Sequence, residues 1–180
     1  MIFKCPYCNE ELKTIFEEKK IKYFGRVLFY TIYCEKCGFK FSDEFTLDVK
    51  EPKAYYLKVE NENDLFAKIV RGSNGYVEIK ELGIKLIPGA FSKSFIKNVE
   101  GFLNDVEDII KSQLKNLSGK KLEKAKKLLE EIEKMKRLEK KFTIVVKDVT
   151  GISKIISKKA KVRKLTEKEI KKLKTSITYL

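Results

Sequence analysis

Four cysteines are the residues of this sequence best suited to chemistry. They form two Cys-x-x-Cys pairs separated by 25 residues, Cys5 with Cys8 and Cys34 with Cys37. Two residues between thiolates let a tight turn aim both sulfurs at one ion, and two such turns complete the tetrahedral sulfur site that suits zinc. Gly38, directly after the second pair, fits a turn that needs positive φ. Because four sulfurs leave no position for an activated water, the spacing predicts one structural Zn²⁺ ion.

Two other interpretations of the cysteine pairs stay open at this point. A rubredoxin-like site would hold iron, since sulfur ligands alone do not separate iron from zinc. Thioredoxin-like redox pairs would each need a helix N-terminus behind the first cysteine. Residues 10–16 are short and weakly periodic, and the second pair follows a predicted strand, so the redox interpretation fits less well.

The lack of any histidine excludes several enzyme classes. Ser-His-Asp and Cys-His triads, HExxH zinc proteases and His-ligated zinc deaminases all require an imidazole. Neither a GxxxxGK[ST] loop nor a strand-borne GxGxxG is present, so no nucleotide cradle is expected. We therefore expect a binding protein and not an enzyme. An enzyme without histidine would have to hold a catalytic metal through carboxylates alone.

Positive charge is concentrated in the second part of the chain. The net charge is +14, with 40 Lys and Arg residues against 26 Asp and Glu. Residues 1–110 carry 17 basic against 18 acidic residues, whereas residues 111–180 carry 23 against 8. Such a region binds RNA, DNA or an acidic protein face, or is simply a solvated surface. The basic residues that would bind nucleic acid are Lys158, Lys159, Lys161, Arg163, Lys164, Lys171 and Lys172.

Length and hydropathy favour a cytoplasmic protein. The 180 residues suffice for one domain with a small satellite. No run of 18 apolar residues is present, and the first eight residues reach a Cys-Pro turn before a secretory segment could form, so we expect no membrane association. The Lys- and Glu-rich composition favours a thermophilic, archaeal source.

The elements that position the cysteines are predicted to be strands. Residues 26–33 and 38–46 are rich in β-branched and aromatic side chains and flank the second pair, which predicts a zinc-ribbon hairpin within residues 1–46. Many aromatic residues crowd this module. We expect them to cover the metal site rather than to stack on bases, because this half of the chain has no excess of positive charge.

The rest of the chain, residues 47–180, predicts a β-domain interrupted by helices. Two amphipathic stretches predict an α-helical hairpin at about 98–138, with Asn98 capping the first helix and Ser118-Gly119 ending it. A capping box at Thr166 predicts a short basic helix over 166–174. Short strands at this spacing favour a barrel or sandwich. The predicted strands are 53–59, 76–79, 84–87, 91–96, 142–149, a return strand 152–156 after a turn, and an edge strand 161–165.

Several motifs resemble those of the ZPR1 (ZPR-one) zinc-finger family. The strongest is Ile-Lys-Tyr-Phe-Gly-Arg-Val at 21–27 leading into Cys-Glu-Lys-Cys-Gly-Phe at 34–39, with the family's cysteine spacing. The chain is similar to a divergent, single-module archaeal member over nearly its whole length. Further matches, in order, are Asp64-Leu65, residues 79–83, 99–103 and 148–153, with departures at Lys80, Lys97, Asn98, Val149 and Ile152.

The resemblance implies both a fold and a function. The implied fold class is α+β, mainly β, with a zinc ribbon followed by a double-stranded β-helix (jelly-roll-like) domain and an inserted helical hairpin. Eukaryotic members carry two such modules and bind translation elongation factor 1-alpha, assisting its folding. The resemblance therefore implies a zinc-dependent protein-binding module whose partner is the archaeal elongation factor 1-alpha. The alternative function is RNA or DNA binding through the basic residues named above.

The resemblance also implies which residues contact that partner. One group is expected beside the two cysteine turns, and the other lies where family motifs persist. For the carboxylates, turn stabilisation is the alternative role. The expected contact residues are Tyr23, Phe24 and Arg26 in the first group and Glu81, Glu100 and Asp148 in the second.

Overall fold

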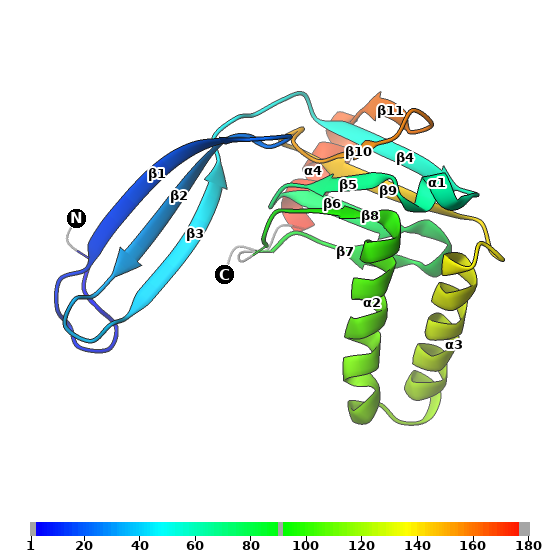
Figure 1. Ribbon diagram of the computed structural model, residues 1–180, viewed down its shortest axis with the longest axis horizontal. Coiled ribbons are helices and arrows are strands. Elements are labelled where there is room, and N and C mark those ends of the chain that lie inside the picture. Colours follow the sequence, from blue (N-terminus) through cyan, green and yellow to red (C-terminus); the bar gives the residue numbers. More distant parts are fainter. Residues whose placement is uncertain (1–2, 90–91, 177–180) are drawn as a thin grey trace. The chain divides into compact units, whose positions relative to one another are not determined.

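A computed structural model gives the arrangement of the chain and describes residues 3–89 and 92–176. The chain divides into two compact units, Met1–Val49 and Lys50–Leu180. Figure 1 shows long strands in the first unit, and shows the helices together with the remaining strands in the second. We refer to the first unit as the ribbon and to the second as the β-domain.

The ribbon is a three-stranded antiparallel sheet with strand order β1-β2-β3. The strands are β1 (Lys13–Ile21), β2 (Gly25–Tyr33) and β3 (Lys40–Thr46). The two predicted strands are present as β2 and β3, whereas β1 was not predicted. Eight of its nine residues are exposed, so this edge strand lacks the apolar alternation by which a half-buried strand is recognised.

The β-domain contains two sheets. The five-stranded sheet has the order β11-β4-β9-β6-β7 and the three-stranded sheet has the order β10-β5-β8. The strands of the first sheet are β4 (Lys53–Val59), β6 (Gly75–Ile79), β7 (Ile84–Leu86), β9 (Phe142–Asp148) and β11 (Lys161–Lys164). The strands of the second sheet are β5 (Lys68–Arg71), β8 (Phe95–Asn98) and β10 (Lys154–Ile156).

The pairing of β10 corrects one prediction. This segment was expected to return alongside β9 after the turn at Thr150-Gly151, but β10 pairs with β5 in the other sheet. The turn therefore carries the chain from one sheet to the other, as in sandwiches whose strands switch layers. The predicted strand 91–96 begins at Phe95 in the structure, and Phe91 lies outside the described residues.

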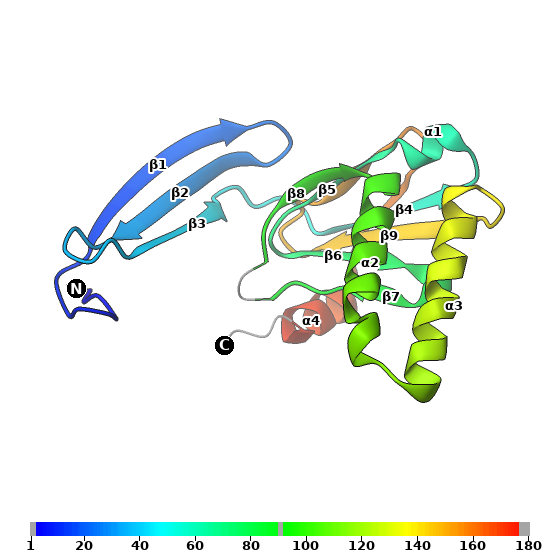
Figure 2. The ribbon, with the colours of Figure 1, turned by 60° about the horizontal axis from the view of Figure 1, so that its bottom comes forward.

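A helical hairpin connects β8 to β9. It consists of α2 (Val99–Gln113), a 3₁₀ turn (Leu114–Asn116) and α3 (Gly119–Lys136), and Figure 2 shows the two helices side by side. Asn98 caps α2, as predicted, by accepting a hydrogen bond from the N–H of Gly101 at 2.8 Å. Apolar residues of both helices join those of the two sheets in one core, which fixes the base of the hairpin.

Three short helical elements complete the β-domain. They are α1 (Glu62–Leu65), a 3₁₀ helix (Lys80–Leu82) and α4 (Glu167–Ser176). The predicted capping box opens α4, because the Thr166 hydroxyl accepts from the N–H of Glu169 and the Glu169 carboxylate accepts from the N–H of Thr166. Among the described helices, none is long and apolar enough to cross a membrane.

Candidate metal centre

The four cysteine sulfurs lie together at one end of the ribbon sheet. All four Sγ atoms are within 4.8 Å of one another, and the Sγ atoms of Cys5 and Cys37 and of Cys8 and Cys34 are 3.5 Å apart. Four sulfurs around one zinc at ~2.3 Å would be separated by ~3.8 Å, so one ion fits this cluster. Each close pair joins the two Cys-x-x-Cys turns, and a bound ion would therefore cross-link them.

The two cysteine turns have the same backbone geometry. In each turn the N–H of the first cysteine donates to the carbonyl oxygen five residues later, at 2.8 Å. Asn9 donates its N–H to the carbonyl of Cys5 at 2.9 Å, and Gly38 donates to that of Cys34 at 3.0 Å. Both donors have positive φ, 59° at Asn9 and 75° at Gly38. The sequence signalled the second turn through its glycine, whereas the matching role of Asn9 was missed.

Backbone N–H groups of the turns also favour thiolates. Burial raises the pKa of the Cys5 thiol. Hydrogen bonds to its sulfur from the backbone of Tyr7 and Cys8, and hydrogen bonds with neighbouring thiols, outweigh this effect and lower the pKa to about 7. The backbone of Phe39 donates to the sulfur of Cys37, although the neighbouring Cys5 thiol and burial raise the pKa of Cys37 in the absence of a cation. Because the thiolate is the metal-binding form, these donors prepare the cluster for a cation.

The turn between β1 and β2 lies at the opposite end of the ribbon from the cysteines. The last residue of β1, Ile21, pairs with the first residue of β2, Gly25, so the turn lies between these two residues. Each strand has nine residues, which corresponds to a strand length of ~27 Å at the usual rise per residue. The expectation that Tyr23, Phe24 and Arg26 lie beside the cysteine turns is therefore wrong. Antiparallel pairing places this motif at the far end of the same strands.

Asp48 explains the glycine and the arginine of this motif. A Cβ atom at Gly25 would lie 2.1 Å from Asp48 Oδ2, so only glycine lets the carboxylate approach. Asp48 then accepts hydrogen bonds from the backbone N–H and the Nε of Arg26, both at 3.0 Å, and holds the pKa of Arg26 above its usual range. Arg26 is thus anchored within the ribbon, although its side chain is half exposed.

Two residues that were expected to contact a partner are buried. Phe24 is 7% exposed and Asp148 is 0% exposed, so neither offers a contact surface and both expectations are corrected. Asp148 accepts hydrogen bonds from the N–H and hydroxyl of Thr150, both at 2.7 Å, and from the N–H and hydroxyl of Ser153. Its carboxylate therefore shapes the loop by which the chain changes sheets.

The other two motif carboxylates also have structural surroundings. Glu81 accepts hydrogen bonds from the N–H and hydroxyl of Thr143, at 2.7 and 2.9 Å, and so ties the 3₁₀ helix to β9. Glu100 lies half-buried in the first turn of α2, where the helix dipole favours a negative charge. Stabilisation of the β-domain accounts for both positions.

The basic residues after Ile152 do not form one open cationic surface. Lys159 pairs with the buried carboxylate of Asp64 at 2.9 Å, and Lys164 pairs with Glu51. Arg163 is bound by both oxygens of a glutamate on α4. The remaining basic residues of the set are exposed, and they are Lys158, Lys161, Lys171 and Lys172.

One face of the ribbon carries a group of largely exposed aromatic side chains, of which Tyr30 and Phe41 were among those expected to cover the metal site. Phe16 pairs with Tyr30 across β1 and β2, and strand alternation places Phe41 and Phe45 of β3 on the same face. The Tyr30 ring stacks on Phe45, with centroids 5.2 Å apart. We call Phe16, Tyr30, Phe41 and Phe45 the aromatic face. The signal for it was the alternate spacing of aromatic residues in β3.

Comparison with known proteins agrees with this geometry. Residues 63–177 match the ZPR1 jelly-roll domain. The chain is 38% identical over 179 residues to an uncharacterized ZPR1-like protein of Methanocaldococcus jannaschii, covering 98% of this chain and 90% of the relative. It is 38% identical over 177 residues to another of Pyrococcus horikoshii, covering 94% and 78%.

A eukaryotic relative matches over a shorter part. This is the zinc finger chaperone zpr1 of Schizosaccharomyces pombe, 30% identical over 106 residues, which cover 58% of this chain and 23% of the relative. With the four-sulfur cluster, these matches confirm the fold class, a zinc ribbon with a jelly-roll domain, and one zinc ion as the cofactor. The chain belongs to the ZPR1 family, and over nearly its whole length it is similar to the ZPR1-like proteins of these two archaea.

Proposed function

We propose that this protein is a non-enzymatic folding or assembly factor for elongation factor 1-alpha and that the ribbon provides the contact surface. The proposal places it in the cytoplasm, with the translation factor. The relative from S. pombe is a zinc finger chaperone, which supports a protein as the partner. The single observation that carries the proposal is the aromatic face of the ribbon.

The aromatic face has the composition of a protein-binding surface. Phe16 is 65% exposed and Phe45 is 54% exposed. In the described part of the ribbon, the three strands form a single layer, and no second element packs over this face. Exposed aromatic residues are enriched at protein interfaces and supply most of the binding energy there. Adjacent aromatic rings on a rigid sheet therefore favour a protein partner.

Charge in the ribbon also favours a protein over nucleic acid. Residues 1–49 carry eight basic and eight acidic residues, and four thiolates around a zinc dication add a charge of −2. A surface without positive excess gains nothing from the counterion release that dominates nucleic-acid binding. The aromatic face is therefore unsuited to stacking on bases of a phosphate-bearing strand.

The chemistry of the zinc site supports a structural role. All four ligand positions are taken by cysteine, so a bound zinc has no open position for substrate or water. Zinc would instead join the two cysteine turns and so fix the start of β1 and the β2–β3 connection. The shape of the aromatic face depends on those strands, which explains why partner binding would require zinc.

Binding to purified archaeal elongation factor 1-alpha tests the proposal by isothermal titration calorimetry. The double variant Phe16→Ser/Phe45→Ser removes two exposed rings and is expected to weaken binding at least ~30-fold, since central aromatic contacts contribute ~2 kcal/mol each. Ile15→Ser is the matched control, because Ile15 is 56% exposed next to Phe16 but on the other face. An equal loss in the control, or no binding by the wild type, would overturn the proposal.

A salt titration separates the proposal from the nucleic-acid alternative. Binding to elongation factor through an apolar face should change little between ~50 and ~200 mM salt. Binding to RNA through the C-terminal lysines should fall log-linearly by several orders of magnitude if six to ten phosphates are contacted. A steep, log-linear affinity for RNA together with no affinity for the elongation factor would favour the alternative function.

A further inference from the structure

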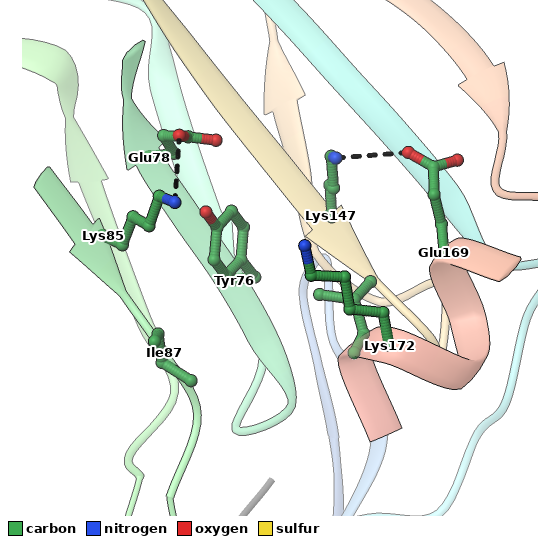
Figure 3. A pocket seen from close by; sticks show the side chains of 8 residues that line it. Tyr76, Glu78, Lys85, Ile87, Lys147, Glu169 and Lys172 are labelled. Carbon is green, nitrogen blue, oxygen red and sulfur yellow. Dashed lines mark hydrogen bonds and ion pairs between the residues drawn. The ribbon is translucent and has the colours of Figure 1, made fainter. Parts of the chain in front are cut away.

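A hollow lies on the outer face of the five-stranded sheet. It has a volume of about 270 Å³ and opens between α4 and the strands β6 and β7 (Figure 3). Side chains of Lys147 and Tyr76 form its floor, because these two residues pair across β9 and β6 and point to the same face. The residues that line the hollow all belong to the β-domain, and the inference drawn from it does not depend on the function proposed above.

Three lysines from three different elements line this hollow. Lys85 comes from β7, Lys147 from β9 and Lys172 from α4, and Figure 3 shows their side chains around the ring of Tyr76. The Lys147 side chain is only 22% exposed, and its ammonium group pairs with Glu169 at 3.2 Å. Partial burial strengthens the interaction of such a cation with any anion that enters.

The carboxylates of the hollow are already matched by cations. Both oxygens of Glu169 accept hydrogen bonds from Arg163, at 2.6 and 2.7 Å, which holds the pKa of Glu169 far below its usual range. Glu78 lies 3.9 Å from Lys85. The lining alone carries a charge of about +1, from Lys85, Lys147 and Lys172 against Glu78 and Glu169. Arg163 does not line the hollow but pairs with Glu169, and with it the local charge is about +2.

The remaining lining adds a hydroxyl and apolar walls. Burial, together with the charge of Glu78 and a hydrogen bond to its carboxylate, raises the pKa of Tyr76, so its protonated hydroxyl already interacts with Glu78. Ile87 and Leu173 form apolar parts of the wall. A ligand that suits these surroundings combines a compact dianion with a small apolar group.

We propose that this hollow binds a small phosphate monoester, with its dianion held among Lys85, Lys147 and Lys172 and its organic part packed against Ile87 and Leu173. Lysine binds phosphate as a compact point charge. The excess of two positive charges matches a phosphate monoester, which carries nearly two negative charges at pH 7. A phosphodiester carries one negative charge, so an RNA or DNA backbone fits this hollow less well.

The site can be tested by titrating the zinc-loaded full chain with phenyl phosphate at constant ionic strength. Amide chemical shifts report the binding. Saturable binding at millimolar or lower concentration is expected, with the largest shifts at Tyr76, Lys147 and Lys172. Inorganic phosphate should bind about threefold more weakly because it lacks the apolar group, and dimethyl phosphate at least tenfold more weakly because it is a monoanion. Shifts that do not saturate, or that centre on Lys158 and Lys161, would overturn the proposal.

Variants of equal charge separate this site from general attraction to a basic protein. Lys85→Gln/Lys172→Gln should weaken binding of phenyl phosphate about tenfold. The control Lys158→Gln/Lys161→Gln removes the same charge from exposed positions outside the hollow and should change binding less than twofold. Equal weakening in both double variants would show an adventitious anion only and would refute the site.

Glu78→Gln provides a test of opposite sign. It removes a negative charge from the wall, so phenyl phosphate should bind about threefold more tightly than to the wild type. A residue that only supported the fold would not improve binding when changed. Weaker binding by Glu78→Gln, with helix content at 222 nm unchanged, would contradict the proposed placement of the dianion.

Discussion

Asn9 and Gly38 occupy equivalent positions in the two cysteine turns, although 28 residues lie between them. Each follows the second cysteine of its pair, has positive φ and donates its N–H to the carbonyl of the first cysteine. This left-handed conformation closes each turn. Glycine adopts it without steric cost, and asparagine tolerates it better than most other residues.

The first prediction follows from this equivalence. Gly38→Ala should lower the stability of the zinc-bound ribbon by ~1–2 kcal/mol, because a Cβ disfavours positive φ, while no atom lies close enough to clash with it. Competition with a zinc chelator measures the effect as a loss of zinc affinity of about 5- to 30-fold. Asn9→Gly is the matched control and should leave zinc affinity unchanged or slightly higher. A loss in the control equal to that in Gly38→Ala would contradict this account.

Metal removal should affect the two units differently. The β-domain has its own core of buried side chains, whereas the ribbon is one sheet with exposed faces and depends on zinc to join its turns. Chelation should therefore make ribbon amides exchange rapidly with solvent while amides of β4 and β9 stay protected. Added zinc should restore protection. Loss of protection in β4 and β9 after chelation would show that the β-domain does not hold its fold independently.

The sequence predicted the metal ligands better than the path of the chain around them. Cysteine spacing is local, and any fold that satisfies a tetrahedral ion must bring Cys5, Cys8, Cys34 and Cys37 together. The helical hairpin was also predictable, since apolar periodicity and the cap at Asn98 are local signals. Strand β1 escaped prediction because a single-layer sheet exposes both faces of its edge strand.

Long-range pairing and burial were the features that the sequence could not supply. The partner of β10 is β5, which lies more than 80 residues earlier in the chain, and local strand and turn signals around Thr150 do not reveal such a distant pairing. Asp148 was expected to contact a partner because it lies in a motif shared with the family, yet four donors from Thr150 and Ser153 surround it. Motif residues such as Phe24 resembled contact residues, but packing explains why they are present.

Gly25 and Asp48 yield a prediction about the ribbon's far end. Gly25→Ala would force its Cβ against Asp48 and require positive φ, so it should destabilise the ribbon by ~2–3 kcal/mol. Thermal unfolding followed by the tyrosine near-ultraviolet signal measures this change. The double variant Gly25→Ala/Asp48→Ala removes the clash and should recover part of the lost stability. If the effects of the two single substitutions on stability simply add in the double variant, the two side chains do not interact.

Asp148 should be intolerant of even a conservative change. In Asp148→Asn, the amide NH₂ must face backbone N–H and hydroxyl groups that now donate to a carboxylate oxygen, whichever way the amide turns. The expected cost is about 3 kcal/mol of unfolding free energy in urea, as for other disrupted buried networks. Asp108→Asn, on the exposed side of α2, should change stability by less than ~0.5 kcal/mol. Similar values for both variants would refute the role assigned to Asp148.

The ion pair of Arg163 and Glu169 should make the stability of the β-domain depend on pH. Arg163, with the hydrogen bond from Thr166 and the charge of Lys147, lowers the pKa of Glu169. A carboxylate whose pKa is lowered by folding contributes stability that is fully present above its unfolded pKa of ~4.3 and is lost as the pH falls toward the folded value. The stability gained from this pair should therefore be constant from about pH 7 to pH 5 and decline below about pH 4.

Urea unfolding of wild type and Glu169→Gln at several pH values measures this difference. The described helices all lie in the β-domain, so circular dichroism at 222 nm reports that unit. Glu169→Gln should be about 2 kcal/mol less stable than the wild type at pH 7, and the two curves should converge toward pH 2. Glu167→Gln, in the same turn of α4 but exposed, should follow the wild type within ~0.5 kcal/mol throughout. A gap that stays constant down to pH 2 would mean that the Glu169 effect is packing and not charge.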